Sequence, residues 1–474
     1  MVFSSSIFLL FFLPIFLLLY WVVPTRYKNA FALLASILFY SWGAPKFVFL
    51  LLVSGLIDFY FCKIMYVQKG RAKTKTLYLL VGYNLALLAY FKYSNFFIDN
   101  LNQLLELTNS QTLSWVHVAL PIGISFFTFQ KISYIVDVYR NTKKPLKRTS
   151  DYLLFVFLFP QLIAGPIVRF NEIANEITNR KQYETLDYKF YGIFRFVIGL
   201  AKKVLIANVL GEYVDLMLGD QLAFLSTGES WLIMISYSLQ IYYDFAGYSD
   251  MAIGLGMFMG FQFPENFNFP YISRNITEFW RRWHITLGTW MREYLYIPLG
   301  GNRGSKSSVF FNLSIVFLLS GLWHGDSWNF LIWGAFHGLF LILDRLFLIN
   351  LTSHLPKVLQ VFLNWFIVII GWVFFRIETL EGAVQLLSTM FSFTQKEFDY
   401  TQVNNLYFTV LFIAITCSIL PFALDEKKLN NIFNVNNRNI YKTMLVSISI
   451  VIIFFLSEIS LTSSGFNPFI YFEF

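Results

Sequence analysis

The chain has 474 residues, of which 57% are apolar and only 14% are charged, whereas soluble domains carry about 25% charged residues. Its mean hydropathy is +0.57. Apolar residues recur along the whole chain in blocks of about 15–25, the length that crosses a hydrocarbon core of about 30 Å. This pattern excludes a soluble domain and predicts a polytopic membrane protein. The net charge of +8 does not indicate nucleic-acid binding, because the basic residues cluster in short stretches between apolar blocks.

Charge alternates between the connecting loops. The apolar blocks lie at residues 2–23, 29–42, 46–62, 77–91, 115–138, 151–168, 190–208, 230–263, 308–323, 329–344, 358–375, 405–422 and 443–461. The basic loops are 63–75, 139–148, 265–306 and 425–442, whereas 211–229 and 377–404 are acidic. Because basic loops stay in the cytoplasm, both termini are expected outside. The first block lacks the basic start and cleavage site of a signal peptide, so we interpret it as a retained first span.

Thirteen blocks conflict with two termini on the same side of the membrane. The conflict lies between 151 and 208, where FPQLIAGPIVRF (159–170) contains the helix breakers Pro160, Gly165 and Pro166. Such backbone is tolerated at membrane depth only against protein or a wet cavity. We expect a re-entrant hairpin here; a kinked span is the alternative. The fold prediction is all-α, with about 12 crossings plus re-entrant and interfacial helices, in one domain covering 1–474.

The polar stretch 274–305 is predicted to begin with a helix at the membrane surface. Asn275 followed by Glu278 fits a helix N-cap. An apolar stripe then recurs at steps of three or four, which predicts one helix ending before Pro298; the stripe comprises Phe279, Trp283, Leu287, Trp290 and Tyr294. The glycine-rich turn that follows contains Arg303 and could hold phosphates; contact with anionic lipid heads is the alternative. His284 lies near the edge of the stripe, where it is either packed or catalytic.

The stretch LSGLWHGDSWNFLIWGAFHG (319–338) places His324 between two apolar runs. An ionisable group in membrane-embedded sequence is a candidate functional residue, and burial keeps imidazole neutral, as a general base requires. Gly321 and Gly325 are expected to leave room for a substrate. The alternative is a histidine that seals a helix contact by a hydrogen bond. His337 is predicted to have a packing role.

Other reactive sites are not indicated. There is no HExxH motif or clustered His, Cys and carboxylate set, so no metal is expected. No GxSxG elbow indicates a serine nucleophile. Cys62 and Cys417 lie in distant apolar blocks and support neither a disulfide framework nor a thiolate metal site. His117 and His354 carry no functional indication.

These stretches together resemble the membrane-bound O-acyltransferase superfamily, specifically its bacterial alginate O-acetyltransferase branch. The resemblance spans nearly the whole chain. Its motifs are MVFSSSIFLLFFLPIF at the start, PIGISFFTFQKISYIVDVYR (121–140), FPQLIAGPIVRF, YYDFAGYSDMAIGLGMFMGFQFPENFNFPY (242–271), EFWRRWHITLGTWMREYLYIPLGGNRG, GLWHGDSWNFLIWGAFHG and the terminal NPFIYFEF.

The resemblance implies a tunnel through the membrane, with a thioester entering from the cytoplasm and the acceptor from outside. It implies that His324 is the catalytic base and that His284 is the second catalytic histidine. It further implies location in the bacterial cytoplasmic (inner) membrane, beside an extracytoplasmic partner of the SGNH-hydrolase type that delivers the acyl group to a polysaccharide. Acetyl-CoA or a similar thioester is expected as donor substrate, with no permanently bound cofactor.

The substrate-binding candidates are five residues close to the two histidines in sequence: Arg281, Arg282, Arg303, Trp323 and Asp326. The three arginines are candidates by charge and position for gripping coenzyme A phosphates. Two other functions stay open. One is a transferase that is fed by an acyl- or aminoacyl-carrier protein and acts on teichoic acid or peptidoglycan. The other is a transporter of lipid-linked sugar, for which no inverted repeat is visible. Alginate, peptidoglycan and other exopolysaccharides are all compatible acceptors.

Overall fold

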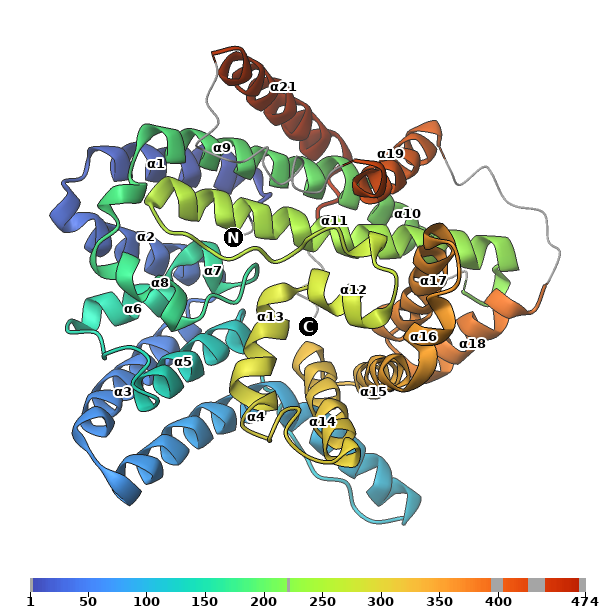
Figure 1. Cartoon of the computed structure of the whole chain (residues 1–474), viewed down its shortest axis with the longest axis horizontal. Coiled ribbons are helices and arrows are strands. Elements are labelled where there is room, and N and C mark those ends of the chain that lie inside the picture. Colours follow the sequence, from blue (N-terminus) through green and yellow to red (C-terminus); the bar gives the residue numbers. More distant parts are fainter. Residues whose placement is uncertain (1–2, 220–221, 394–403, 425–439, 469–474) are drawn as a thin grey trace. The chain divides into compact units, whose positions relative to one another are not determined.

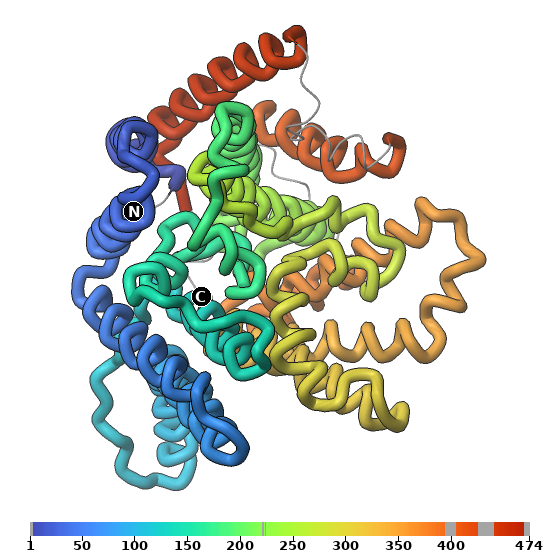
Figure 2. Tube along the Cα trace, turned by 60° about the vertical axis from the view of Figure 1, so that its left-hand side comes forward, coloured from blue at the N-terminus to red at the C-terminus, as the bar shows by residue number. Residues whose placement is uncertain are grey.

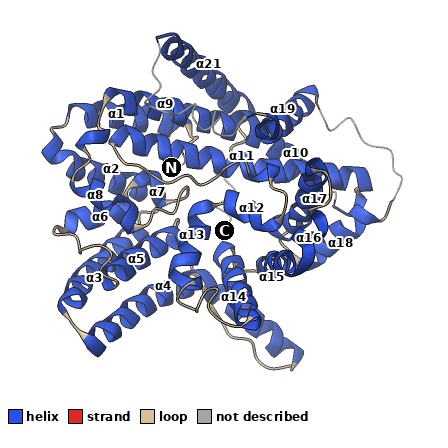
Figure 3. Cartoon of the chain, in the orientation of Figure 1, coloured by secondary structure: helices blue, strands red, loops and turns tan. Residues whose placement is uncertain are grey.

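A computed structural model describes residues 3–219, 222–393, 404–424 and 440–468. These residues form helices and connecting loops without a strand, which confirms the all-α prediction for this part of the chain (Figure 3). Contacts group the chain into two compact units. Unit 1 comprises Ile7–Glu184 with Met259–Pro264, and unit 2 comprises Thr185–Phe258 and Glu265–Phe474 with Val2–Ser6. The single domain expected from the sequence stays a prediction.

Unit 1 carries the first eight α-helices, drawn in blue to teal in Figure 1. They are α1 (Leu13–Val22), α2 (Lys28–Gly43), α3 (Phe47–Val67), α4 (Gly70–Leu107), α5 (Ile124–Tyr139), α6 (Thr149–Phe157), α7 (Phe159–Leu162) and α8 (Phe170–Thr178). Part of its core is a cluster of phenylalanine rings around Phe159, whose centroid lies 5.0 Å from that of Phe16 and 5.3 Å from that of Phe39.

Unit 2 carries the remaining helices, and the trace in Figure 2 follows them from green to red. They are α9 (Leu186–Ala201), α10 (Asn208–Leu218), α11 (Thr227–Met259), α12 (Ile276–Arg282), α13 (Ile285–Met291), α14 (Lys306–His324), α15 (Trp328–Leu343), α16 (Ile349–Thr352), α17 (Lys357–Arg376), α18 (Leu380–Phe391), α19 (Asn405–Ala423) and α21 (Ile440–Ser464). Its core includes the fully buried rings of Trp283, Trp333 and Trp372.

Six helical stretches of the described chain are long and apolar enough to cross a membrane. They are Phe47–Val67, Lys306–His324, Trp328–Thr352, Lys357–Arg376, Asn405–Ala423 and Ile440–Ser464. The chain is therefore a multi-pass membrane protein, but the expected count of about 12 crossings is not confirmed. Several predicted blocks form shorter helices, such as α5 with 16 residues. Most of the expected cytoplasmic loop 425–442 lies outside the described residues.

The stretch expected to interrupt a span does break the helix. Helix α6 ends at Phe157, the four-residue α7 follows, and Gly165 takes a left-handed φ of +98°. Side chains satisfy several polar groups of this buried backbone: the hydroxyl of Ser36 accepts a hydrogen bond from the amide of Phe159, and Gln161 donates to the carbonyl of Phe155. Non-helical backbone in apolar surroundings requires such partners.

Glycines let α14 and α15 pack at backbone distance. A Cβ on Gly321 would lie 2.2 Å from the carbonyl oxygen of Phe330, and a Cβ on Gly334 would lie 2.3 Å from that of Phe317. A Cβ on Gly325 would lie 2.0 Å from the Phe330 ring. The prediction that Gly321 and Gly325 leave room for a substrate is therefore wrong, because Phe330 fills the space beside both.

We expect Gly334→Ala to destabilise the protein, since the new methyl group would meet a backbone carbonyl that cannot rotate away. Overpacking of this kind typically costs about 1–3 kcal/mol. The melting temperature of the detergent-solubilised protein should fall. The matched control is Gly82→Ala in α4, where no atom lies within 4 Å of the added Cβ. Equal melting temperatures for the two variants would contradict the close-packing account.

Candidate active site

Two side chains anchor helix α12 at its N-terminus: the carboxamide of Asn275 and the carboxylate of Asp344. The Asn275 side chain accepts a hydrogen bond from the amide of Glu278 at 2.8 Å, so the predicted N-cap is confirmed. Asp344, which follows α15, accepts from both the amide and the hydroxyl of Thr277, at 2.8 and 2.9 Å. Negative or acceptor groups at this end satisfy amides that have no partner within the helix. The start of α12 is thereby tied to the end of α15.

The helix predicted to run from Asn275 to before Pro298 is interrupted at His284. Helix α12 ends at Arg282, α13 begins at Ile285, and His284 between them has the left-handed φ of +44°. Such a backbone costs a residue with a side chain roughly 1–2 kcal/mol. Two backbone hydrogen bonds hold the break open: the amide of Ile285 donates to the carbonyl of Asn266, and that of Asn268 donates to the carbonyl of Arg282, both at 2.9 Å. The single-helix prediction is therefore wrong.

The side chain of Asn266 fixes the proton on the His284 ring. Its Oδ1 lies 3.0 Å from Nδ1 of His284 and 2.8 Å from the donating hydroxyl of Thr286, while its Nδ2 donates to the hydroxyl of Ser249. Because an amide oxygen only accepts, Nδ1 of His284 must donate and carry the proton. Nε2 then bears a lone pair, and it has no hydrogen-bond partner among the described residues.

His284 is neutral at physiological pH. Its side chain is 1% exposed, and burial lowers the pKa of its imidazole from 6.5 to about 3. The edge-on ring of Phe245, 4.7 Å away between centroids, contributes to this apolar surrounding. A neutral ring with an unpartnered lone pair can accept a hydrogen bond from a hydroxyl group.

His324 occupies the C-terminal end of α14, next to His284. The two ring centroids are 6.4 Å apart, and His324 is 3% exposed. Aromatic rings pack around it edge-on: Trp323 at 4.9 Å, Trp333 at 5.0 Å and Phe375 at 5.2 Å. The sequence singled out both histidines, and the structure brings them together inside unit 2.

Two further candidates lie beside this pair in different settings. Trp323 is buried, with its ring centroid 6.0 Å from that of His284, so it borders both histidines. Asp326 is exposed in the turn between α14 and α15. It lines a cavity of about 450 Å³ that Phe330 and Phe375 also line, and the ring of Phe375 contacts His324. The side chain of Phe375 therefore lies between this cavity and His324 and contacts both.

The cavity near His324 is polar and acidic. Its lining residues are Asp215, Tyr237, Gln240, Asp326, Ser327, Phe330, Phe375, Arg376, Ile377, Glu378 and Pro468. Arg376 is ion-paired with Asp215 at 2.7 Å, whereas Asp326 and Glu378 have no ion-pair partner in the described part of the chain. Gln240 is 5% exposed, and its Oε1 accepts no hydrogen bond from the described residues. The cavity thus offers several hydrogen-bond acceptors.

The three candidate arginines have different environments. Arg282 is half-buried and donates to a carboxylate oxygen of Glu278 and to the carbonyl of Asn268, each at 3.1 Å. Arg281 is exposed at the end of α12, and Arg303 is exposed in the predicted glycine-rich turn, where Gly301 has a φ of +57°. Arg282 therefore has a structural role already, and phosphate binding by any of the three stays a prediction.

His337 is completely buried, as its predicted packing role requires. The centroid of its ring lies 5.1 Å from the ring centroids of both Trp280 and Trp333. Neither ring nitrogen of His337 has a hydrogen-bond partner among the described residues. The sequence reading missed Asn266, the residue that orients His284. Its place next to the aromatic residues of PENFNFPY was the available signal.

Comparisons with known proteins show the family of this chain. A model of the membrane-bound O-acyltransferase (MBOAT) family matches residues 34–381, which include both histidines. The probable alginate O-acetylase AlgI of Pseudomonas aeruginosa is 46% identical over 83% of this chain and 75% of its own length. AlgI of Azotobacter vinelandii is 38% identical over the full length of both chains. The peptidoglycan O-acetyltransferase of Helicobacter pylori is 39% identical over 82% of this chain and 80% of its own.

The match to the family model covers well over half of the chain, and relatives near 40% identity span most of it. The two neighbouring buried histidines of this chain, His284 and His324, lie within the region that the family model matches. The chain belongs to the membrane-bound O-acyltransferase family.

Proposed function

We propose that this chain transfers an acetyl group from a cytoplasmic thioester to a hydroxyl group outside the membrane, and so leads to O-acetylation of a polysaccharide. The observation that carries the proposal is the pair of buried histidines with centroids 6.4 Å apart in a chain of this family. Relatives named for acting on alginate and on peptidoglycan support a polysaccharide as the final acceptor.

In the proposed reaction His324 is the general base. It takes the proton of the acceptor hydroxyl as that oxygen forms a bond to the thioester carbonyl carbon. The carbon–sulfur bond then breaks, and the proton held by His324 is returned to the leaving thiolate. Net transfer of the acyl group from sulfur to oxygen leaves the histidine unchanged.

His284 orients the acceptor in this scheme. Because Nδ1 donates to Asn266, Nε2 can only accept, so it suits a hydrogen bond from a second donor group of the acceptor, beside the hydroxyl that reacts. Stabilisation of the developing oxyanion needs a donor and is disfavoured for this tautomer. The neutral ring therefore holds the acceptor through that second donor group, while the single proton of the attacking hydroxyl goes to His324.

The acidic cavity beside Phe375 is the proposed approach for the acceptor. Hydroxyl groups donate well to carboxylates, and Asp326 and Glu378 are available for such bonds. Glu378 lies in the acidic loop 377–404, which the alternation of charge places outside, and this supports an opening to the outside. We assign acceptor contacts to Asp326 and packing against the catalytic pair to Trp323.

Acetyl-CoA is the proposed donor, with Arg281, Arg282 and Arg303 as candidates for its phosphates. The bacterial inner membrane is the proposed location, and an extracytoplasmic SGNH-hydrolase-like protein the proposed partner. The alternative donor is an acyl-carrier protein. With a carrier-protein donor, the rate of transfer would depend on the concentration of the acyl-loaded carrier and not on that of free acetyl-CoA.

Replacing His324 with glutamine tests the base. Glutamine can fill the space and form hydrogen bonds but cannot take a proton, so acetyl transfer should fall by about 10²–10⁴. The measurement is transfer of labelled acetyl by the purified protein, with the melting temperature as a check on folding. His354→Gln, at an exposed histidine, is the matched control. Near-normal transfer by a folded His324→Gln protein would refute the proposed base.

Asn266→Asp should make transfer more sensitive to acid. A carboxylate beside Nδ1 favours the imidazolium and raises the pKa of His284 from its low value. As pH falls through the raised pKa, Nε2 gains a proton and can no longer accept a hydrogen bond from the second donor group of the acceptor. The acid limb of the rate profile should therefore move to higher pH than in the unmodified protein. The control Ser249→Ala removes only the hydroxyl to which Asn266 donates, and it should keep the pH–rate profile of the unmodified protein. If the pH–rate profiles of Asn266→Asp and the unmodified protein superimpose, His284 does not have this role.

Asp326→Asn tests the cavity. Loss of one unpaired carboxylate should raise the Michaelis constant for an oligosaccharide acceptor more than it lowers turnover, because binding and not chemistry is weakened. Glu381→Gln, at an exposed carboxylate outside the cavity, should change neither quantity. If Asp326→Asn instead slows turnover at an unchanged Michaelis constant, the cavity is not the acceptor site.

A further inference from the structure

The charged side chains that line a second cavity, within unit 1, are mostly basic. Its volume is about 1060 Å³, and it lies between the loop that joins α5 to α6, the start of α2 and the end of α8. Its cationic lining residues are Arg26, Lys143, Lys144, Lys147, Arg148, Arg180 and Lys181. Its acidic lining residues are only Asp151 and Glu184, which leaves five positive charges in excess.

The two acids are already engaged by other groups. Glu184 is ion-paired with Lys28 at 2.8 Å and with Arg180 at 3.4 Å, and Asp151 accepts a hydrogen bond from the side-chain amide of Asn29 at 3.1 Å. By contrast, Lys144, Lys147 and Arg148 have no ion-pair partner in the part of the chain that the structure describes, and all three are exposed. Concentrating unpaired like charges is unfavourable, so the arrangement favours an anionic occupant.

One wall of the cavity is rigid. The guanidinium of Arg180 is 6% exposed and donates to the backbone carbonyl of Met259 at 2.9 Å and to the side-chain oxygen of Asn29 at 2.6 Å. A third bond joins it to the hydroxyl of Tyr20 at 3.0 Å. A fixed arginine costs little entropy when an anion binds, because its position is set beforehand.

Backbone amides at the start of α6 add hydrogen-bond donors to this cavity. Helix α6 begins at Thr149, its N-cap residue Arg148 makes no capping hydrogen bond with its side chain, and Ser150 in its first turn lines the cavity. The amides of a helix N-terminus attract anions. Together with the fixed arginine and the unpaired cations, they supply hydrogen-bond donors and positive charge for the oxygens of a phosphate group.

We propose that this cavity binds phosphate groups, supplied either by a soluble nucleotide-like molecule or by the headgroup of an anionic phospholipid. The inference rests on the proposed function only where the soluble ligand is coenzyme A, the proposed donor; binding of a phospholipid headgroup is independent of it. Both sources present a phosphate group to the cavity. They differ in that the first is dissolved in water and the second is part of the membrane.

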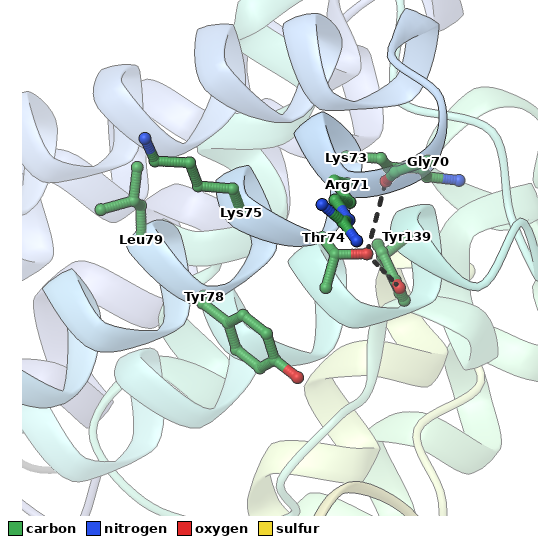
Figure 4. Close-up of a pocket in the computed structure, with 8 residues that line it drawn as sticks. All are labelled: Gly70, Arg71, Lys73, Thr74, Lys75, Tyr78, Leu79 and Tyr139. Atoms are coloured by element: carbon green, nitrogen blue, oxygen red, sulfur yellow. Dashed lines mark hydrogen bonds between the residues drawn. The ribbon is translucent and has the colours of Figure 1, made fainter.

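The test uses the full-length protein and a triple variant, Lys144→Gln, Lys147→Gln and Arg148→Gln. A triple variant in another basic hollow of unit 1, Arg71→Gln, Lys73→Gln and Lys75→Gln, is the matched control (Figure 4). It removes the same charge from another predicted cytoplasmic loop. Lys73 there already donates to Asn141 at 3.2 Å, and the Thr74 hydroxyl is hydrogen-bonded to that of Tyr139.

One arm measures equilibrium binding of labelled coenzyme A in nanodiscs of phosphatidylcholine, and the other counts bound phosphatidylglycerol by native mass spectrometry. Loss of the charge-assisted contacts should weaken binding by about 10- to 100-fold in one arm. A loss confined to coenzyme A identifies a soluble phosphate ligand, and a loss confined to phosphatidylglycerol identifies a headgroup. Equal behaviour of the two triple variants in both arms would overturn the proposal, since the effect would then be general surface charge.

Discussion

The hydrogen bonds of Asn266 are the interaction on which the geometry of the histidine pair depends. Asn266 uses its backbone carbonyl to hold the amide after His284 and its side chain to hold the ring itself. Without the first contact, the left-handed backbone at His284 would relax towards a continuous helix, because nothing intrinsic to histidine favours that conformation. Without the second, the imidazole could exchange its tautomer. One residue therefore sets both the position and the protonation state of a buried group.

The same requirement, that buried polar groups find partners, explains the polar residues scattered through apolar sequence. Asp344 caps α12 through Thr277, and Ser36 and Gln161 satisfy the broken backbone around α7. In apolar surroundings an unpaired polar group costs several kcal/mol, so each break in a helix must come with its own donor or acceptor. Irregular backbone and polar side chains occur together here because neither is stable alone.

Part of this could be predicted from the sequence. Hydropathy blocks identified a helical membrane protein, and the cap at Asn275 and the helix breakers near Gly165 follow local rules that operate within a few residues. The break at His284 could not be predicted, because the apolar stripe continues through it at helical spacing and the opposing hydrogen bonds come from Asn266, eighteen residues away. The role of Gly321 was misjudged for a related reason: whether a missing side chain leaves space depends on Phe330, which another helix supplies.

The two cavities have opposite charge, and this constrains what each can bind. The cavity near His324 has two unpaired carboxylates, Asp326 and Glu378, whereas the cavity in unit 1 has five positive charges in excess. A phosphate-bearing molecule is repelled by the first and attracted by the second, and an uncharged hydroxyl suits the first because carboxylates accept its proton in a hydrogen bond. A uronate polymer carries one negative charge per residue and would meet the same repulsion near His324. In the proposed reaction this charge favours a hydroxyl on an uncharged group, in keeping with the proposed partner that carries the acetyl group to an anionic polymer.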